Sequence, residues 1–289
     1  MNAGRGLTVE RMMQLGRVSR ASFYRFDENG HTGHDADMDL RDAIQRIALE
    51  WPSYGRPRIT AELRRCGWKV NPKRVYRILR EDNLLCIRKR KFIVTTDSNH
   101  GRKIYPNLAR TMALTGLDQL WMADITYIRL REEFVFLAVV LNAFSRRVIG
   151  WALSRTLEDE LTLTALKMAL SRRSAQPGLI HHSDRGSQYA SSRYTELLKE
   201  NGISVSMSRQ GNPWDNAACE SFMKTLKYEE VFRSEYRDLQ EAYRSIREFL
   251  EKIYNEKRLH SALGYVPPTE FEASLAAQQN EAATRRLFI

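Results

Sequence analysis

Three acidic residues in the second half of the chain occupy positions from which carboxylates can act together. Asp124 lies within a predicted strand, where Asp is disfavoured unless something holds it. Asp184 ends another predicted strand, at the carboxyl edge where open sheets place their sites, and Glu220 lies about two turns into a later helix. Carboxylate oxygens are hard ligands that suit Mg²⁺ in octahedral geometry. Two such ions about 4 Å apart activate an attacking oxygen and stabilise a leaving one in phosphodiester chemistry.

Cations and a histidine accompany these carboxylates. One helical stripe carries Asn216, Glu220, Lys224 and Lys227. Cations beside a carboxylate suit a site that handles phosphate. His182 shares a strand face with Asp184, so it either supports that carboxylate from behind or is an ordinary packed strand histidine. Because the chain has 35 acidic residues, each carboxylate taken alone is more often a surface charge or a helix cap.

The elements that would position these residues follow from the hydrophobic periodicity after Leu117. Apolar runs predict strands over 120–130, 134–141, 147–153, 178–182 and 203–207. Helices are predicted over 161–170, over 191–200, and from Asn212-Pro213 past Lys227, where Asn can cap and Pro fits the first helical position. Three strands, helix, strand, helix, strand, helix is the order of an RNase H-like sheet, so we expect an α/β catalytic core.

The positive charge of the chain is confined to its first part. The whole sequence carries a net charge of +11, and residues 1–110 hold 23 Lys and Arg against 12 Asp and Glu, which accounts for all of it. The remaining residues hold 23 of each kind. Such asymmetry indicates a nucleic-acid-binding module attached to a neutral domain, the alternative being a solvated basic surface without a partner.

The basic part has the outline of a helix-turn-helix. Apolar spacing predicts a helix from about residue 39, a short second helix after Gly55-Arg56-Pro57, and a turn at Gly67. Asn71-Pro72 opens a third helix that ends near Glu81, and such a helix would lie in the major groove of DNA. The side chains that it would present to DNA are those of Lys73, Arg74, Arg77 and Arg80. A smaller copy of the pattern falls at 7–26.

The pattern as a whole predicts five segments and an intracellular setting. The segments are a short helical N-terminal piece with a possible DNA-binding role (1–37), a helix-turn-helix domain (38–91), a linker (92–117), an RNase H-like core with a helical extension (118–272) and a tail (273–289). The three cysteines are too far apart for a disulfide framework or a zinc site. The longest apolar run has eight residues and no signal-peptide pattern is present, so we expect a cytoplasmic protein.

Three longer stretches carry a family resemblance: HHSDRGSQYAS, NPWDNAACESFMKTLKYEEV and YNEKRLHSALGYVPPTEFE. Together with the spacing of Asp184, Glu220 and Lys227, they resemble the OrfB transposase of the large bacterial insertion-sequence family numbered three. The core of that family is of the DDE type found in retroviral integrases. The stretch YGRPRITAELRRCGWKVNPKRVYRILRE resembles the helix-turn-helix that precedes this core in the family. The likeness spans about residues 40–272.

The resemblance implies a metal-dependent DNA strand transferase. By this likeness Asp124, Asp184 and Glu220 bind two Mg²⁺ or Mn²⁺ ions, and Lys227 contacts DNA near the transposon end. The enzyme would nick terminal inverted repeats to free a 3′-hydroxyl and direct that hydroxyl at target DNA, without a covalent protein intermediate. Its partners would be DNA, further copies of itself on DNA at the nucleoid, and the upstream-frame OrfA product, whose leucine zipper this chain lacks. A structure-selective nuclease on the same fold and a catalytically silent DNA-binding regulator are the alternatives.

Overall fold

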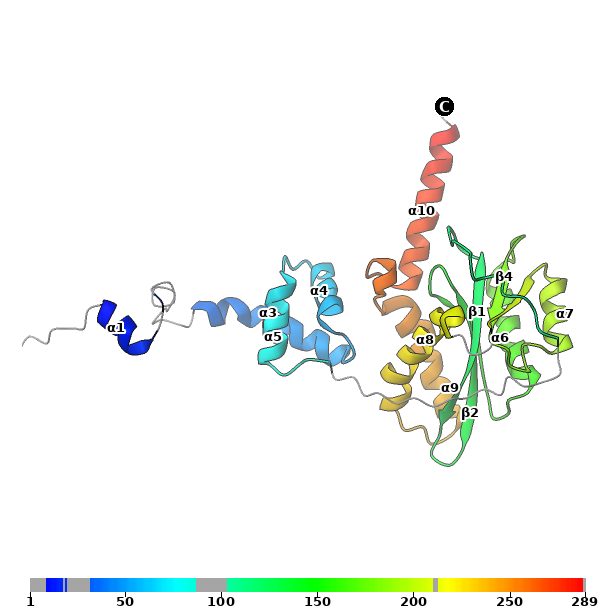
Figure 1. The fold of residues 1–289 in the computed structure, drawn as a ribbon, viewed down its shortest axis with the longest axis horizontal. Coiled ribbons are helices and arrows are strands. Elements are labelled where there is room, and N and C mark those ends of the chain that lie inside the picture. Colours follow the sequence, from blue (N-terminus) through cyan, green and yellow to red (C-terminus); the bar gives the residue numbers. More distant parts are fainter. Residues whose placement is uncertain (1–8, 18, 20–31, 87–102, 210–212, 288–289) are drawn as a thin grey trace, which may run out of the picture. The chain divides into compact units, whose positions relative to one another are not determined.

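The computed structural model describes residues 9–17, 19, 32–86, 103–209 and 213–287 (Figure 1). The chain divides into two compact units, residues 1–86 and 87–289. In the first unit, α1 (Val9–Gly16) lies within the smaller predicted helix-turn-helix at 7–26, whose second half falls outside the described residues. Most of the predicted linker, residues 92–102, falls outside them as well.

Three helices form the basic module of the first unit: α3 (Thr32–Glu50), α4 (Arg56–Arg65) and α5 (Pro72–Glu81). The predicted cap is present, because Asn71 Oδ1 accepts a hydrogen bond of 2.8 Å from the Lys73 amide and Pro72 takes the first helical position. Gly67, with φ +87°, makes the turn between α4 and α5. The buried side chains that hold the three helices together are Leu40, Ile44, Ile59, Leu63, Val75 and Ile78.

The second unit is built on one five-stranded sheet. Its strands are β1 (Leu120–Arg129), β2 (Phe134–Asn142), β3 (Val148–Ser154), β4 (Ile180–Ser183) and β5 (Ser204–Met207). The strand order is β3-β2-β1-β4-β5. The first three strands form an antiparallel meander, whereas β4 runs parallel to β1 and β5 runs parallel to β4. This mixed sheet confirms the predicted α/β fold class.

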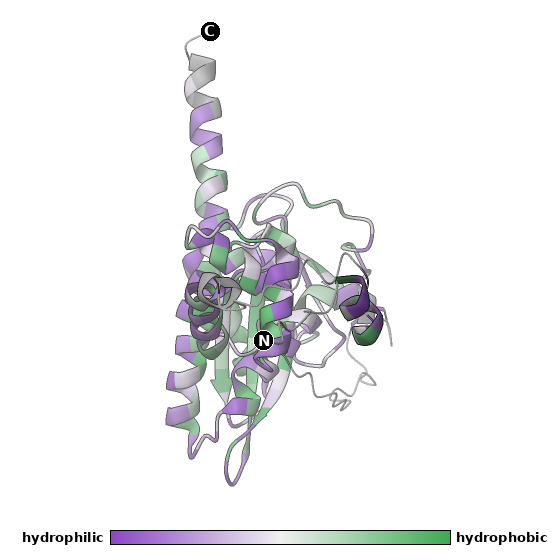
Figure 2. Ribbon diagram, turned by 90° about the vertical axis from the view of Figure 1, so that its left-hand side faces the viewer, coloured by the Kyte–Doolittle hydropathy of each residue, from purple (hydrophilic) through white to green (hydrophobic). Residues whose placement is uncertain are grey.

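Helices cover both faces of the sheet. On one face, α6 (Asp159–Arg172) and α7 (Ser192–Glu200) pack on a cluster that includes Trp121. On the other face, α8 (Ala217–Glu229), α9 (Leu239–Glu248) and η3 (Phe249–Lys257) pack on a second cluster that includes Trp151. Figure 2 shows apolar residues along the strands between these layers. Gly150 allows the close approach of α6 to β3, since a Cβ there would lie 2.2 Å from the Ala165 carbonyl oxygen.

The start of α8 differs from the prediction. A 3₁₀ turn, η1 (Pro213–Asn216), precedes the α-helix, which begins at Ala217, so Glu220 lies in its first turn rather than two turns in. The predicted cap residue Asn212 lies outside the described residues. Asn216 separates the two helical pieces, because its φ of −121° and ψ of 29° are not helical and its side chain turns inward to the carbonyl of Ala123. A tertiary contact therefore sets this boundary.

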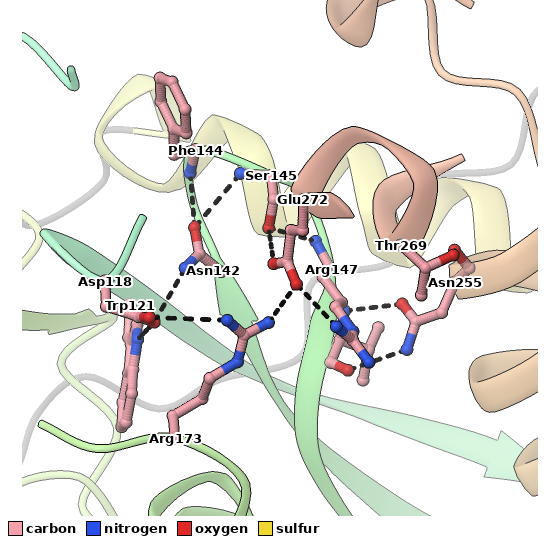
Figure 3. Close-up of polar contacts among 11 residues, drawn as sticks. Asp118, Trp121, Asn142, Phe144, Ser145, Arg147, Arg173, Asn255, Thr269 and Glu272 are labelled. Atoms are coloured by element: carbon pink, nitrogen blue, oxygen red, sulfur yellow. Dashed lines mark hydrogen bonds and ion pairs between the residues drawn. The ribbon is translucent and has the colours of Figure 1, made fainter. Parts of the chain in front are cut away.

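A buried ion-pair network attaches the last helix, α10 (Pro268–Leu287), to the sheet (Figure 3). Glu272 is 7% exposed and accepts hydrogen bonds from Ser145 Oγ and Arg147 Nη1, each at 2.6 Å, and from Arg173 Nη2 at 2.5 Å. The sequence predicted a boundary between core and tail after residue 272, but α10 runs without a break from Pro268 to Leu287. None of the helices in the described part of the chain has the length and apolar character of a membrane span.

We expect Glu272→Ala to lower the free energy of unfolding by about 3 kcal/mol, because it leaves the guanidinium groups of Arg147 and Arg173 without their shared carboxylate. Glu281→Ala, at an exposed position on the same helix, should change it by less than about 0.5 kcal/mol. Urea denaturation of both variants checks this. Equal stability of the two would mean that the network does not hold α10 in place.

Candidate functional site

Asp124 and Asp184 lie on or directly after two adjacent parallel strands, β1 and β4. Residues 120–122 of β1 pair with residues 180–182 of β4, and the two acidic residues follow these paired segments directly. Asp124 Oδ1 accepts a hydrogen bond of 2.9 Å from the amide of Ile125. Asp184 Oδ1 accepts one of 2.9 Å from the amide of Gly186, which fixes the turn after β4. Asp124 thus lies within β1, two residues beyond its last pair with β4, and Asp184 lies directly after the end of β4.

Asp124 interacts electrostatically with the two other predicted carboxylates and with Lys227. The pKa of Asp124 is raised from 3.8 to about 8, first by burial and then by the negative charges of Asp184 and, more weakly, Glu220. The hydrogen bond from Ile125 and the positive charge of Lys227 oppose this rise in pKa. Burial also raises the pKa of Glu220, against the charge of Lys224 one helical turn away. The structure therefore gathers three predicted residues around Asp124, namely Asp184, Glu220 and Lys227.

As they lie in the structure, the three carboxylates do not form a complete metal site. Within the described residues, no group of three or more His, Cys, Asp and Glu side chains is arranged to hold a metal ion. Glu220 is the outlying member, because it is exposed and affects the pKa of Asp124 less than Asp184 does. The donor set nevertheless fits a hard divalent cation, since all three ligands are carboxylates and a cation would offset the repulsion that raises the pKa of Asp124.

Asn216 was predicted to contact DNA, but the structure places its side chain inside the core. Its side chain is 6% exposed, and Nδ2 donates a hydrogen bond of 3.3 Å to the carbonyl oxygen of Ala123. The residue therefore holds the start of α8 against β1, next to Asp124, and is too buried to contact DNA. Lys224 on the same stripe is exposed, and Lys227 is half-buried.

Sequence reasoning missed Tyr189, which belongs to the same stretch as Asp184. Its ring is 2% exposed, and its hydroxyl has no hydrogen-bond partner among the described residues. Burial raises the pKa of this hydroxyl well above 10, and the charges of Asp124 and Asp184 add to the effect, so it lies near the carboxylates as a neutral phenol. The only signal for it in the sequence is its place in the stretch HHSDRGSQYAS.

His182 is a packed strand histidine. It is fully buried, with Nδ1 2.8 Å from Ser206 Oγ and Nε2 3.0 Å from Ser208 Oγ. Burial lowers its pKa, so the ring is neutral and one of its nitrogens donates while the other accepts. Since both nitrogens bind serine hydroxyls, the structure favours the packing interpretation over support of Asp184.

The four cations of the predicted recognition helix differ in their contacts within the module, because two of them pair with a buried carboxylate. The side chains of Lys73, Arg74, Arg77 and Arg80 are all exposed on α5. Arg74 Nε donates a hydrogen bond of 2.7 Å to Asp37 on α3, and Arg77 pairs with the other oxygen of that buried carboxylate. Burial alone would raise the pKa of Asp37, but these two arginines outweigh it and hold that pKa below its usual range. Arg74 and Arg77 therefore also stabilise the module, which the sequence did not indicate.

A second missed feature of the module is an exposed aromatic residue on α5. Tyr76 is 42% exposed, and the guanidinium of Arg56 lies 5.6 Å from its ring centroid. The pair joins the N-terminus of α4 to the exposed face of α5. Tyr76 therefore adds an aromatic surface to the face that was predicted from its cations.

Comparisons with known proteins agree with this two-part organisation. An HTH-like domain matches residues 35–92, and the Integrase core domain matches residues 115–213 and, in a second form, residues 201–268. Among solved structures, the simian T-cell lymphotropic virus intasome in complex with PP2A regulatory subunit B56 gamma has a TM-score of 0.45 at 14% identity, covering 80% of this chain and 74% of that one. The catalytic core of BIV integrase has a TM-score of 0.42 at 18% identity, covering 56% of this chain and 99% of that one.

Curated relatives match over nearly their whole length. A 31 kDa protein of insertion element IS600 from Shigella sonnei is 38% identical, over 90% of this chain and 97% of the relative. The transposase of IS904 from Lactococcus lactis is 39% identical, over 76% of this chain and 87% of the relative. Transposase InsF of IS3A from Escherichia coli is 34% identical, over 92% of this chain and 94% of the relative. The chain therefore belongs to the IS3 family of insertion-sequence transposases, polynucleotidyl transferases with a DNA-binding HTH-like domain and an integrase core.

Proposed function

We propose that Asp124, Asp184 and Glu220 hold two divalent cations, Mg²⁺ or Mn²⁺, with which this transposase cuts and joins DNA at the ends of its insertion sequence. The observation that carries the proposal is the electrostatic interaction of the three carboxylates, one within β1, one directly after β4 and one in the first turn of α8. When bound, the cations activate the attacking oxygen and stabilise the leaving oxygen. Because the relatives are transposases, the family assignment favours a transposase over a structure-selective nuclease or a catalytically silent regulator.

The cations of α8 would hold the DNA beside these carboxylates. Lys227 is half-buried and attracted by Asp124, so its ammonium group is positioned to bind a phosphate next to the scissile bond. Lys224 is exposed one turn earlier and would contact a neighbouring phosphate. Water serves as the nucleophile in the nicking step, and the freed 3′-hydroxyl serves in the joining step.

The remaining partners follow from the family resemblance. The helix-turn-helix would bind the terminal inverted repeats, and the core would take target DNA. Two copies of the chain would bring two element ends together. The OrfA product would add a further DNA-binding helix-turn-helix and a leucine zipper, and the assembly would work at the nucleoid.

Metal binding can be tested without activity. We expect saturating Mg²⁺ or Mn²⁺ to raise the melting temperature of the wild-type chain by several degrees, because a ligand present at 100 times its Kd stabilises by about 2.7 kcal/mol. Asp184→Asn should show no such shift, whereas Glu196→Gln, at an exposed position on α7, should behave as wild type. Equal shifts in wild type and Asp184→Asn would place the metal elsewhere.

DNA binding by α5 is tested best through Lys73 and Arg80, because Arg74→Ala or Arg77→Ala would also weaken the pairing of buried Asp37. We expect Lys73→Ala with Arg80→Ala to weaken DNA binding by the full chain and to flatten the log–log salt dependence by about 0.9 per lost contact. Binding titrations at several salt concentrations measure both effects. An unchanged affinity and slope would exclude these two side chains from the DNA interface.

A further inference from the structure

Two aromatic rings of the β1–β2 hairpin lie in a row between two cations, one from α8 and one from β1. The Lys227 Nζ atom lies 4.9 Å from the ring centroid of Tyr127, whose ring meets that of Phe134 edge-on at 5.8 Å. The Arg129 guanidinium lies 5.7 Å from the Phe134 ring centroid, and these two residues face each other across the strand pair. We call these four residues the aromatic–cation strip.

The strip begins at the proposed active site and extends away from it. Lys227 is the member that interacts with Asp124, and residues 127 and 129 follow Asp124 along β1 toward the hairpin turn. The pairing of β1 with β4 ends at Met122, so β4 does not flank this part of β1. Lys227 therefore joins the strip to the carboxylates, whereas Tyr127 and Arg129 lie on the other face of β1 from Asp124, along the part of the strand that β4 does not cover.

Folding does not account for the aromatic members. Neither Tyr127 nor Phe134 belongs to the two apolar clusters that hold the sheet and its helices together. Phe134 is 50% exposed although it is the first residue of a strand whose later residues are buried. An exposed aromatic residue held between a tyrosine ring and an arginine suits a binding surface better than a core.

The chemistry of the strip fits one kind of ligand. Ammonium and guanidinium groups pair with phosphates, whereas aromatic rings offer faces and edges on which exposed bases stack. Duplex DNA would meet only the cations, because its base faces are already stacked. An acidic peptide would likewise leave the rings unused. Unpaired DNA uses both kinds of side chain.

We propose that the aromatic–cation strip binds the last unpaired nucleotides of an element end and leads that strand to the carboxylates. The inference rests on the proposed function, because it takes the carboxylates as the place where the strand is cut. Lys227 and Arg129 would bind phosphates on either side of the bases that contact Tyr127 and Phe134.

The test compares two labelled oligonucleotides, a blunt element end and the same end with three unpaired nucleotides, in EDTA so that no cleavage occurs. We expect the full wild-type chain to bind the unpaired end more tightly. Phe134→Ala should lose roughly tenfold in affinity for that end and keep its affinity for the blunt end, in line with the stacking contribution of one base. Phe134→Leu should behave as Phe134→Ala, because it keeps apolar volume but has no ring.

The control is Phe232→Ala, which removes a ring that is 58% exposed in the same unit and contacts Tyr228 rather than the strip. It should bind both ends as wild type does. The proposal is overturned if Phe134→Ala discriminates between the two ends as wild type does, if Phe134→Leu restores binding, or if Phe134→Ala changes self-association instead. Because binding is measured without metal, the strip can fail while the carboxylates remain the catalytic site, and the reverse also holds.

Discussion

Asp124→Asn, Asp184→Asn and Glu220→Gln are each expected to reduce nicking and joining by roughly a hundredfold to a thousandfold or more, as is usual when a group that stabilises the transition state electrostatically is removed. Each change removes the charge that would hold a metal ion but alters the side-chain volume little. Gel assays with labelled element ends and target DNA measure both steps. Binding to the ends should persist in all three variants, since all three residues lie outside the HTH-like domain at residues 35–92.

The same variants carry an internal control for folding. Because burial and two neighbouring carboxylates raise the pKa of Asp124 to about 8, the metal-free wild type loses stability as the pH rises from about 4 to 8. Across that range the unfolded carboxylate releases its proton more readily than the folded one. Asp124→Asn should lack this dependence of stability on pH and, at pH 8 without metal, should melt at a higher temperature than the wild type.

In the joining assay, any one of the three variants that retains a substantial fraction of wild-type joining removes that residue from the site.

Chelation of divalent metal should abolish strand cleavage and joining completely, and Mg²⁺ or Mn²⁺ should restore both. The proposed ligands are all carboxylates, so neither step has another means of activating the attacking oxygen. DNA binding should survive EDTA, because the proposed metal ligands all lie outside the HTH-like domain at residues 35–92. Cleavage that proceeds unimpaired in chelator would contradict the metal mechanism while leaving the family assignment intact.

Local patterns predicted most of the framework of the core. Apolar runs located the strands, with Asp124 inside one and Asp184 at the end of another. Because β1 and β4 are parallel neighbours paired up to Met122 and His182, both acidic residues follow the paired segments at the same level of the sheet. The start of α8 could not be predicted in this way. It depends on the Asn216 side chain, which reaches a carbonyl 93 residues earlier in the sequence.

The features that the sequence did not reveal are those made by distant pairs. Asp37 pairs with Arg74 and Arg77, which are 37 and 40 residues away in the sequence. The sequence alone therefore indicated that all the cations of α5 were available to DNA. Glu272 binds Ser145 across 127 residues, and its pattern in the sequence is that of an ordinary helical glutamate. The aromatic–cation strip depends on the register of β1 against β2 and on the packing of α8. Spacing along the chain reports none of these contacts.

The most direct measurement of the central claim is anomalous diffraction from Mn²⁺ in crystals of the chain bound to an element end. We expect two peaks about 4 Å apart, within ligand distance of the carboxylates of Asp124, Asp184 and Glu220. The peaks should be absent when all three residues are replaced by their amides. Peaks elsewhere in the core, or peaks that persist in the triple variant, would contradict the assignment of these carboxylates as the catalytic metal site.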